Sequence, residues 1–117
     1  MYIEQPMFGG GAPSCEIECS PPLFEVIRAV STRMEVGIED IVSVRDLTYE
    51  RHYARALVMV IAMQNGIATD DELQRALSCT EEEIDLAFKQ LDYDMGFWFA
   101  ADVAWKTVSP SLALEAA

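Results

Sequence analysis

The side chains best suited to metal chemistry in this sequence are three cysteines and one histidine. Cys15 and Cys19 form a C-x3-C pair, while His52 and Cys79 lie far from that pair along the chain. A closed zinc site takes four Cys or His ligands, usually as two closely spaced pairs, so this pattern predicts no metal site and no cofactor. An odd number of cysteines without a framework spacing is typical of reduced thiols in an intracellular protein.

Residues able to act as nucleophiles or bases do not form a known catalytic motif. His52 has no nucleophile at a spacing that would indicate a catalytic pair. Ser43, Thr48 and Cys79 do not lie in a nucleophile-elbow sequence. No glycine-rich loop followed by Lys-Ser/Thr is present to hold phosphates. Carboxylates are abundant, but on helix faces they are mostly solvated. We therefore expect a protein that is not an enzyme.

Acidic side chains outnumber basic ones and gather in one part of the chain. The formal net charge is −12, from 20 Asp and Glu against 8 Lys and Arg. From Thr69 to Asp94, nine acids and two bases give a net charge of −7. Such a segment repels DNA phosphates and attracts basic proteins. The acids that we expect to form an interaction surface are Asp70, Asp71, Glu81, Glu82, Glu83 and Asp85.

A smaller group of basic side chains lies earlier in the chain. If Arg45, Arg51, His52 and Arg55 converge near one loop, they would grip one or two phosphates or the acids of a partner. The other interpretation is a salt-bridged helix face, in which Asp46 caps a helix or pairs with several of these bases. The sequence leaves both interpretations open.

The elements that must position these side chains are helices. Apolar residues recur at helical spacing, and the sequence predicts an all-α domain of five to six helices around a long central helix. The central helix runs from a cap at Thr48 to about Asn65, and its second half is apolar nearly all round, as in a buried helix. We expect this domain to cover residues 21–108, after a flexible lead over 1–20 and before a loose tail over 109–117.

Neither a membrane span nor a leader peptide is expected. The longest apolar run, Ala56 to Met63, has eight residues, whereas a spanning helix needs about 20. The N-terminus has no basic region followed by an apolar stretch. The sequence therefore predicts a cytoplasmic protein that makes no membrane contact.

Local signals mark the elements before the central helix. Ser20 precedes two prolines, which suits the start of a first helix, and Gly37 is a natural stop. A short helix is expected over residues 39–43, and residues 45–47 are expected to form a loop.

Two capping boxes mark the helices after the central one. In Thr69-x-x-Glu72 and in Thr80-x-x-Glu83, threonine and glutamate can each bond the other's backbone amide. A tight turn around Ser78 joins the two helices that these boxes open. This shape is that of a helix-turn-helix, and an αα-hairpin in an ordinary bundle would look similar.

The C-terminal segment is rich in aromatic side chains. Met95-Gly96 is expected to break the preceding helix, and a last short helix is expected over residues 97–106. Its aromatic residues pack on the core in one interpretation, and form an exposed patch for a partner in the other. These residues are Phe97, Trp98, Phe99 and Trp105.

Four stretches share their order and spacing with one bacterial family: Val36–Ser43, Tyr53–Met59, Gly66–Thr69 and Ile84–Ala87. Together with the expected helix order, they make residues 23–91 resemble the C-terminal duplex-DNA-binding domain (domain IV) of the replication initiator DnaA, in the Trp-repressor-like superfamily. The resemblance implies a helix-turn-helix fold and DNA binding.

The sequence departs from this family where the family reads DNA. The family's basic loop carries several lysines and arginines, whereas residues 43–47 here read Ser-Val-Arg-Asp-Leu. Its DNA-reading helix opens with Arg-Asp-His-Thr-Thr, whereas residues 79–83 here read Cys-Thr-Glu-Glu-Glu. The family's apolar core positions are kept in this sequence, while the positions that read DNA in the family carry carboxylates here.

These departures favour a small acidic protein that acts through protein–protein contact. Its partner would be a basic or nucleic-acid-binding protein, which a surface imitating phosphates would block, as small phage and mobile-element inhibitors do. The alternative is a DnaA-like DNA-binding regulator of replication or transcription that uses Arg45, Arg51 and Arg55. A homodimer built on the aromatic C-terminal segment is a third expectation.

Overall fold

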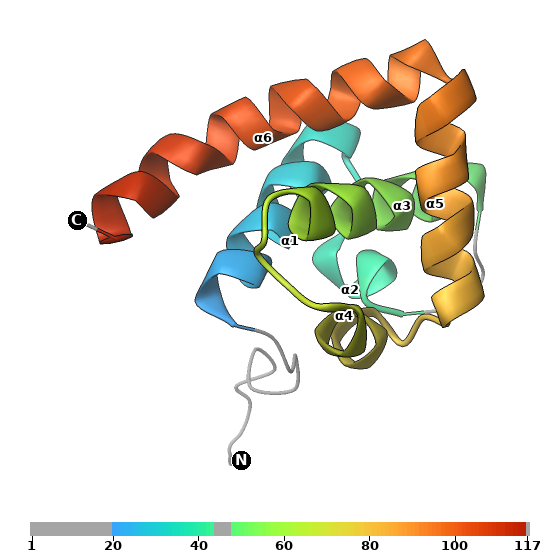
Figure 1. The fold of residues 1–117 in the computed structure, drawn as a ribbon, viewed down its shortest axis with the longest axis horizontal. Coiled ribbons are helices and arrows are strands. Elements are labelled where there is room, and N and C mark those ends of the chain that lie inside the picture. The colour runs from blue at the N-terminus through green and yellow to red at the C-terminus, as the bar shows by residue number, and fades with distance from the viewer. Residues whose placement is uncertain (1–19, 44–47, 117) are drawn as a thin grey trace.

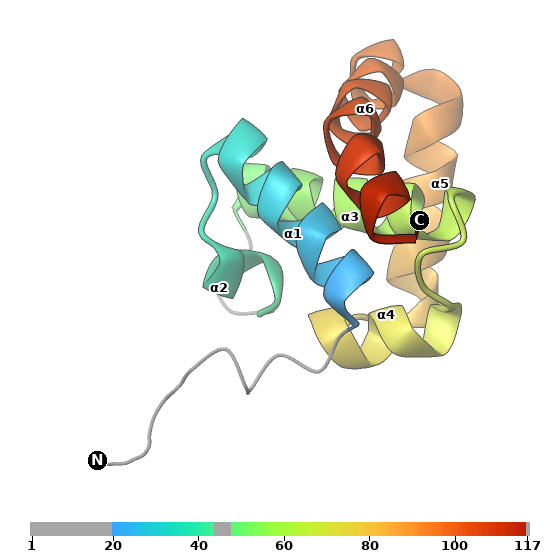
Figure 2. The ribbon, with the colours of Figure 1, turned by 90° about the vertical axis from the view of Figure 1, so that its left-hand side faces the viewer.

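Six α-helices make up the described part of the chain, which covers residues 20–43 and 48–116 in this computed structural model. No strand occurs within those ranges, so the expected all-α class is confirmed. Figures 1 and 2 show the helices wrapped around α3. The helices are α1 (Pro21–Met34), α2 (Ile38–Ile41), α3 (Tyr49–Gln64), α4 (Asp70–Leu77), α5 (Glu81–Tyr93) and α6 (Met95–Ala116).

The central helix is α3, and its bounds agree with the expectation. Thr48 caps its start by accepting a hydrogen bond from the Arg51 amide at 3.3 Å, and Asn65 follows its last turn. Every residue from Ala54 to Ala62 is buried. The helix packs against α1, α2, α4, α5 and α6, which explains why its sequence is apolar on all sides.

The first helix begins as expected and ends two residues earlier than expected. Ser20 Oγ accepts from the Leu23 amide at 3.4 Å, with proline in the first turn. The helix stops at Glu35, which adopts a left-handed conformation (φ 57°). The expected stop, Gly37, instead precedes α2, which occupies residues 38–41 rather than 39–43.

Helices α4 and α5 are joined by residues 78–80. Ser78 takes a left-handed conformation (φ 52°) that reverses the chain without a glycine. The Cys79 side chain turns inward, where its thiol lies 3.5 Å from the Leu73 carbonyl oxygen. This buried anchor fixes the turn between the two helices.

The last helix is much longer than expected. It starts at Met95 and continues to Ala116, past the predicted end at residue 106 and through the segment expected to be a loose tail. The break before it falls at Asp94, whose Oδ1 accepts from the Phe97 amide at 3.0 Å. Pro110 lies inside this helix, and the sequence from 107 to 116 holds no glycine that would end it.

Some expectations fall outside the described residues. These are the flexible lead before Ser20, the loop residues Arg45, Asp46 and Leu47, and the Cys15–Cys19 pair. Among the helices that are described, none is long and apolar enough to cross a membrane.

Candidate functional site

The centre of the charged region is a buried arginine. Arg55 lies on α3 and its side chain is fully buried (0% exposed). Its Nη1 donates to the backbone carbonyls of Leu77 (2.7 Å), Ile41 (2.8 Å) and Ser43 (3.1 Å). Its Nε and Nη2 donate to the two carboxylate oxygens of Glu83, both at 3.1 Å. The guanidinium therefore ties together the ends of α2 and α4 and the start of α5.

This geometry overturns the expectation that Arg55 contacts phosphate or a partner. A buried cation needs an opposite charge and a full set of acceptors. Glu83 supplies the charge in a bidentate pair with the guanidinium, and the three carbonyls supply the remaining acceptors. No part of Arg55 is left to face a ligand.

The same contact changes the role of Glu83. In α4 the expected capping box is complete, since Thr69 Oγ1 accepts from the Glu72 amide at 3.2 Å and Glu72 Oε1 accepts from the Thr69 amide at 2.8 Å. In α5 only half of the box forms: the Glu83 amide donates to Thr80 Oγ1 at 3.1 Å. The Glu83 carboxylate binds Arg55 instead, so Glu83 does not belong to the exposed acidic surface.

The other expected acids remain at the surface. Glu81, Glu82 and Asp85 are exposed on the first turns of α5, and Asp71 is exposed on the first turn of α4. We call these four side chains the acidic face. Asp70 is only partly exposed and accepts a hydrogen bond from Gln74 on its own helix. Both helix starts lie at the same end of the molecule, at the foot of α5 in Figure 1.

Acids at these positions have a structural role as well as an electrostatic one. The first turn of a helix carries a partial positive charge that carboxylates stabilise. Three glutamates occupy the first turn of α5, but only Glu83 also bonds to a base. Glu81 and Glu82 are exposed and leave negative charge directed at solvent.

The three described members of the expected basic group, Arg51, His52 and Arg55, do not converge on a common site. Arg51 forms an ion pair with Asp40 of α2 at 3.4 Å, whereas the salt-bridge interpretation of the sequence named Asp46, which lies outside the described residues. His52 is exposed and lines a hollow of about 490 Å³ between α3 and α5. Arg55 is buried, and Arg45 lies outside the described residues.

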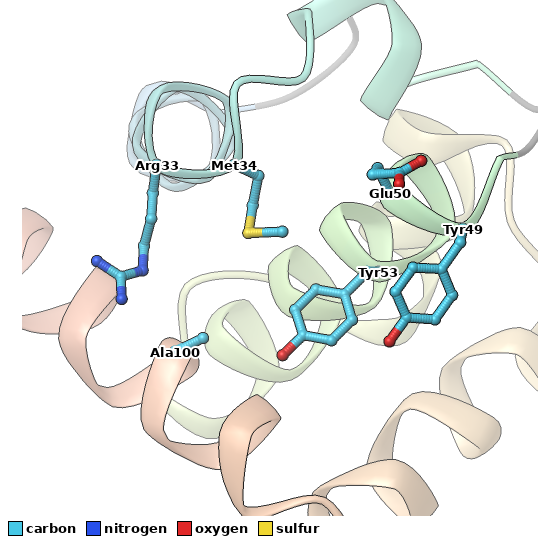
Figure 3. Close-up of a pocket in the computed structure, with 6 residues that line it drawn as sticks. All are labelled: Arg33, Met34, Tyr49, Glu50, Tyr53 and Ala100. Atoms are coloured by element: carbon cyan, nitrogen blue, oxygen red, sulfur yellow. The ribbon is translucent and has the colours of Figure 1, made fainter.

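A second hollow lies between α1, α3 and α6 (Figure 3). It has a volume of about 580 Å³, and Arg33, Tyr49, Glu50 and Tyr53 supply its polar groups. In Figure 3 the two phenol rings lie side by side on α3, one helical turn apart, while the Arg33 side chain extends from α1 on the other side of the hollow. The Tyr53 ring also packs edge-on against the buried Phe97 at 5.2 Å between ring centroids.

The chemistry available in this hollow is limited by the state of Tyr53. Burial, and then the negative charge of Asp94, raise the pKa of the Tyr53 phenol above its usual value. A phenol of raised pKa stays protonated at neutral pH. Tyr53 can therefore donate a hydrogen bond but is a poor proton acceptor, which is unfavourable for general-base catalysis.

The Cys79 thiol is equally unreactive. Burial, and then the nearby Glu83 carboxylate, raise its pKa to about 11. Because the thiolate is the reactive form, Cys79 serves as a small apolar side chain in the turn. Within the described residues no group of three or more His, Cys, Asp or Glu could hold a metal ion.

One feature of this region was missed from the sequence. The buried Arg55–Glu83 pair joins residues 28 positions apart, but a signal for it exists, because Arg55 directly precedes the long apolar stretch of α3. The aromatic residues of the C-terminal segment divide between the two interpretations that the sequence left open. Phe97 is buried and Trp105 is partly buried against the core, but Trp98 and Phe99 are exposed.

Comparison with known proteins adds no relative to this geometry. No family model, curated protein or solved structure matches the chain.

Proposed function

We propose that this protein acts through protein–protein contact, with its acidic face bound to a basic, nucleic-acid-binding protein. The observation that carries the proposal is which charged side chains are buried and which are exposed at the start of α5. Arg55 is buried and bonded to Glu83, while Glu81, Glu82 and Asp85 face solvent. The surface there presents carboxylates, and the buried Arg55 is not available to them.

Closely spaced carboxylates resemble a row of phosphates to a basic surface. A partner that binds nucleic acid through Lys and Arg would find a similar field on this chain and be blocked by it. The divergence from the DnaA-like pattern supports this inhibitory role, since carboxylates stand at residues 81–83 where that family carries DNA-reading side chains. The alternative, direct DNA binding through Arg45, Arg51 and Arg55, loses support because Arg55 is buried.

The test is charge reversal of the acidic face. Tagged wild-type protein and the triple variant Glu81→Lys, Glu82→Lys, Asp85→Lys are used to capture proteins from a lysate treated with nuclease. The wild type should retain a set of basic proteins, and the variant should lose them. The wild-type capture should also weaken as salt is added, because the contact is electrostatic.

The matched control reverses two acids elsewhere on the surface. Glu39 and Glu50 are exposed and lie in the first turns of α2 and α3, so Glu39→Lys, Glu50→Lys removes the same kind of helix-start charge. This control should capture the same proteins as the wild type. An unchanged capture by the triple variant contradicts the proposal, and so does a salt-sensitive mobility shift of mixed DNA duplexes by the wild type.

A further inference from the structure

The hollow between α1, α3 and α6 is lined by hydrogen-bond donors that no described residue uses (Figure 3). Arg33 forms no ion pair with a carboxylate in the described part of the chain, whereas Arg28 on the same helix pairs with Glu25. Within residues 20–43 and 48–116, the side-chain hydroxyls of Tyr49 and Tyr53 also form no hydrogen bond. One guanidinium and two phenols are therefore available to a ligand in this hollow.

Two of these donors point to the same part of the hollow. In Figure 3 the Arg33 guanidinium and the Tyr53 hydroxyl extend from opposite sides toward Ala100 of α6. Ala100 is buried, and its small side chain leaves the space between the two donors open. The positive charge of Arg33 also acts on the Tyr53 phenol, where it opposes the effects that raise the pKa. The two donors therefore belong to one site.

Apolar surface lies beside the donors. The Met34 thioether extends from α1 into the hollow (Figure 3), and Tyr49 is 72% exposed, so its ring is largely uncovered. The rings of Tyr49 and Tyr53 lie 5.8 Å apart between centroids. An aromatic ligand gains ring contact with these phenols and sulfur contact with Met34. The volume of about 580 Å³ is within the range of roughly 300–1,000 Å³ that small-molecule sites have.

The charges around the hollow favour a ligand with a single negative charge. Among the described residues that line it, Arg33 is the only base and Glu50 the only acid. Glu50 lies at the opposite end of the hollow from Arg33 (Figure 3), and the negative charge of Asp94 acts on Tyr53. A dianion such as a phosphate monoester would be repelled by both carboxylates with one cation to offset them. A carboxylate carries one charge and has two oxygens that accept from guanidinium and phenol.

We propose that this hollow binds a small aromatic monocarboxylate. Its carboxylate lies between Arg33 and Tyr53 and accepts hydrogen bonds from both, while its ring lies on Tyr49 and Met34. The site uses none of the residues of the acidic face, so it stands or falls independently of the contact with a basic protein.

The test titrates the full chain with 3-phenylpropionate and follows the backbone amides by two-dimensional NMR. Signals of residues 33–34, 49–53 and 100 should shift saturably, with a dissociation constant of about 1 mM for a ligand of about eleven non-hydrogen atoms. The uncharged 3-phenylpropanol should bind at least about tenfold more weakly. Phenyl phosphate should also bind more weakly than the carboxylate. Since the chain carries −12, it has no general attraction for anions, and a saturable shift reports a specific contact.

Two substitutions remove the proposed donors one at a time. Arg33→Met should raise the dissociation constant by at least about tenfold, because a charge-assisted hydrogen bond is lost. Tyr53→Phe keeps the ring that packs on Phe97 and removes the hydroxyl, so it should weaken binding about three- to tenfold. The matched controls are Arg28→Met on the same helix and Tyr93→Phe on α5, which should both bind as the wild type does. Circular dichroism melting of each variant shows that the fold is kept.

Several outcomes would overturn the proposal. One is no saturable shift up to about 10 mM 3-phenylpropionate, and another is equal binding of 3-phenylpropanol. Unchanged affinity in Arg33→Met would show that the carboxylate does not lie at this guanidinium. Tighter binding of phenyl phosphate would contradict the monocarboxylate class. Binding that is lost in Lys89→Met, with shifts around the hollow between α3 and α5 that Lys89 lines, would place the anion elsewhere.

Discussion

Glu72 and Glu83 show how one residue type at one helix position takes two roles. Each is the third residue of its helix, and each follows a threonine cap. Glu72 completes its capping box at the surface, whereas Glu83 reaches inward to the buried Arg55. The difference arises because the buried Arg55 lies opposite Glu83. Arg55 has no other carboxylate within its hydrogen-bond set, and an unpaired buried charge is far more costly than an unmade cap.

Replacing each glutamate by glutamine separates these roles. Glutamine serves in a capping box, so Glu72→Gln should lower the free energy of unfolding by less than about 0.5 kcal/mol. Glu83→Gln leaves a buried guanidinium without its counter-charge and should cost about 2 kcal/mol. Urea denaturation of the two variants measures the difference. Equal losses would mean that the Arg55–Glu83 pair does not stabilise the fold.

At the scale of elements, short polar side chains set where most helices begin. Ser20, Thr48, Thr69 and Thr80 each accept a hydrogen bond from the third amide of the following helix. Asp94 does the same for α6, although it directly follows α5. This single residue allows two helices to meet at a sharp corner, since its side chain satisfies a free amide of the new helix.

The α6 start should make stability depend on pH. The Phe97 amide, and then the Gln90 side chain, hold the pKa of Asp94 below its usual value. The stability from this carboxylate is therefore present above its unfolded pKa, near 4, and is lost as the pH falls through the lower folded value. Thermal midpoints of wild type and Asp94→Ala should differ at neutral pH and converge in acid.

The control for this pH series is Asp85→Asn, an exposed carboxylate inside α5. Its midpoint should follow the wild type across the same range. A constant gap between wild type and Asp94→Ala down to strongly acidic pH would show that the Asp94 side chain acts without its charge.

The whole molecule has two ends of different character along α5. The acidic face lies at the foot of this helix beside α4, and exposed apolar side chains gather at its other end, where α5 turns into α6 (Figures 1 and 2). A net charge of −12 on 117 residues opposes compaction through self-repulsion. Apolar burial around α3 and the Arg55–Glu83 pair hold the fold together against that repulsion.

Salt should therefore stabilise the fold. Sodium chloride screens the repulsion between exposed acids, whereas the buried Arg55–Glu83 pair is screened much less. We expect the thermal midpoint, measured at low protein concentration, to rise from low salt to physiological ionic strength. The variant Glu81→Lys, Glu82→Lys should rise less. A midpoint that falls with salt would mean that exposed ion pairs outweigh the repulsion.

The sequence by itself determined the helical class, the central position of α3 and the starts of most helices, because apolar periodicity and capping residues act locally. Contacts between distant residues decided the rest. Only packing showed that Glu83 turns inward to Arg55, removing both from the surface, and that Trp98 and Phe99 stay outside while Phe97 fills the core. The length of α6 also escaped local signals, since Pro110 weakens a helix without having to end it. A side chain's type gives its chemistry, but its neighbours decide whether that chemistry faces a partner.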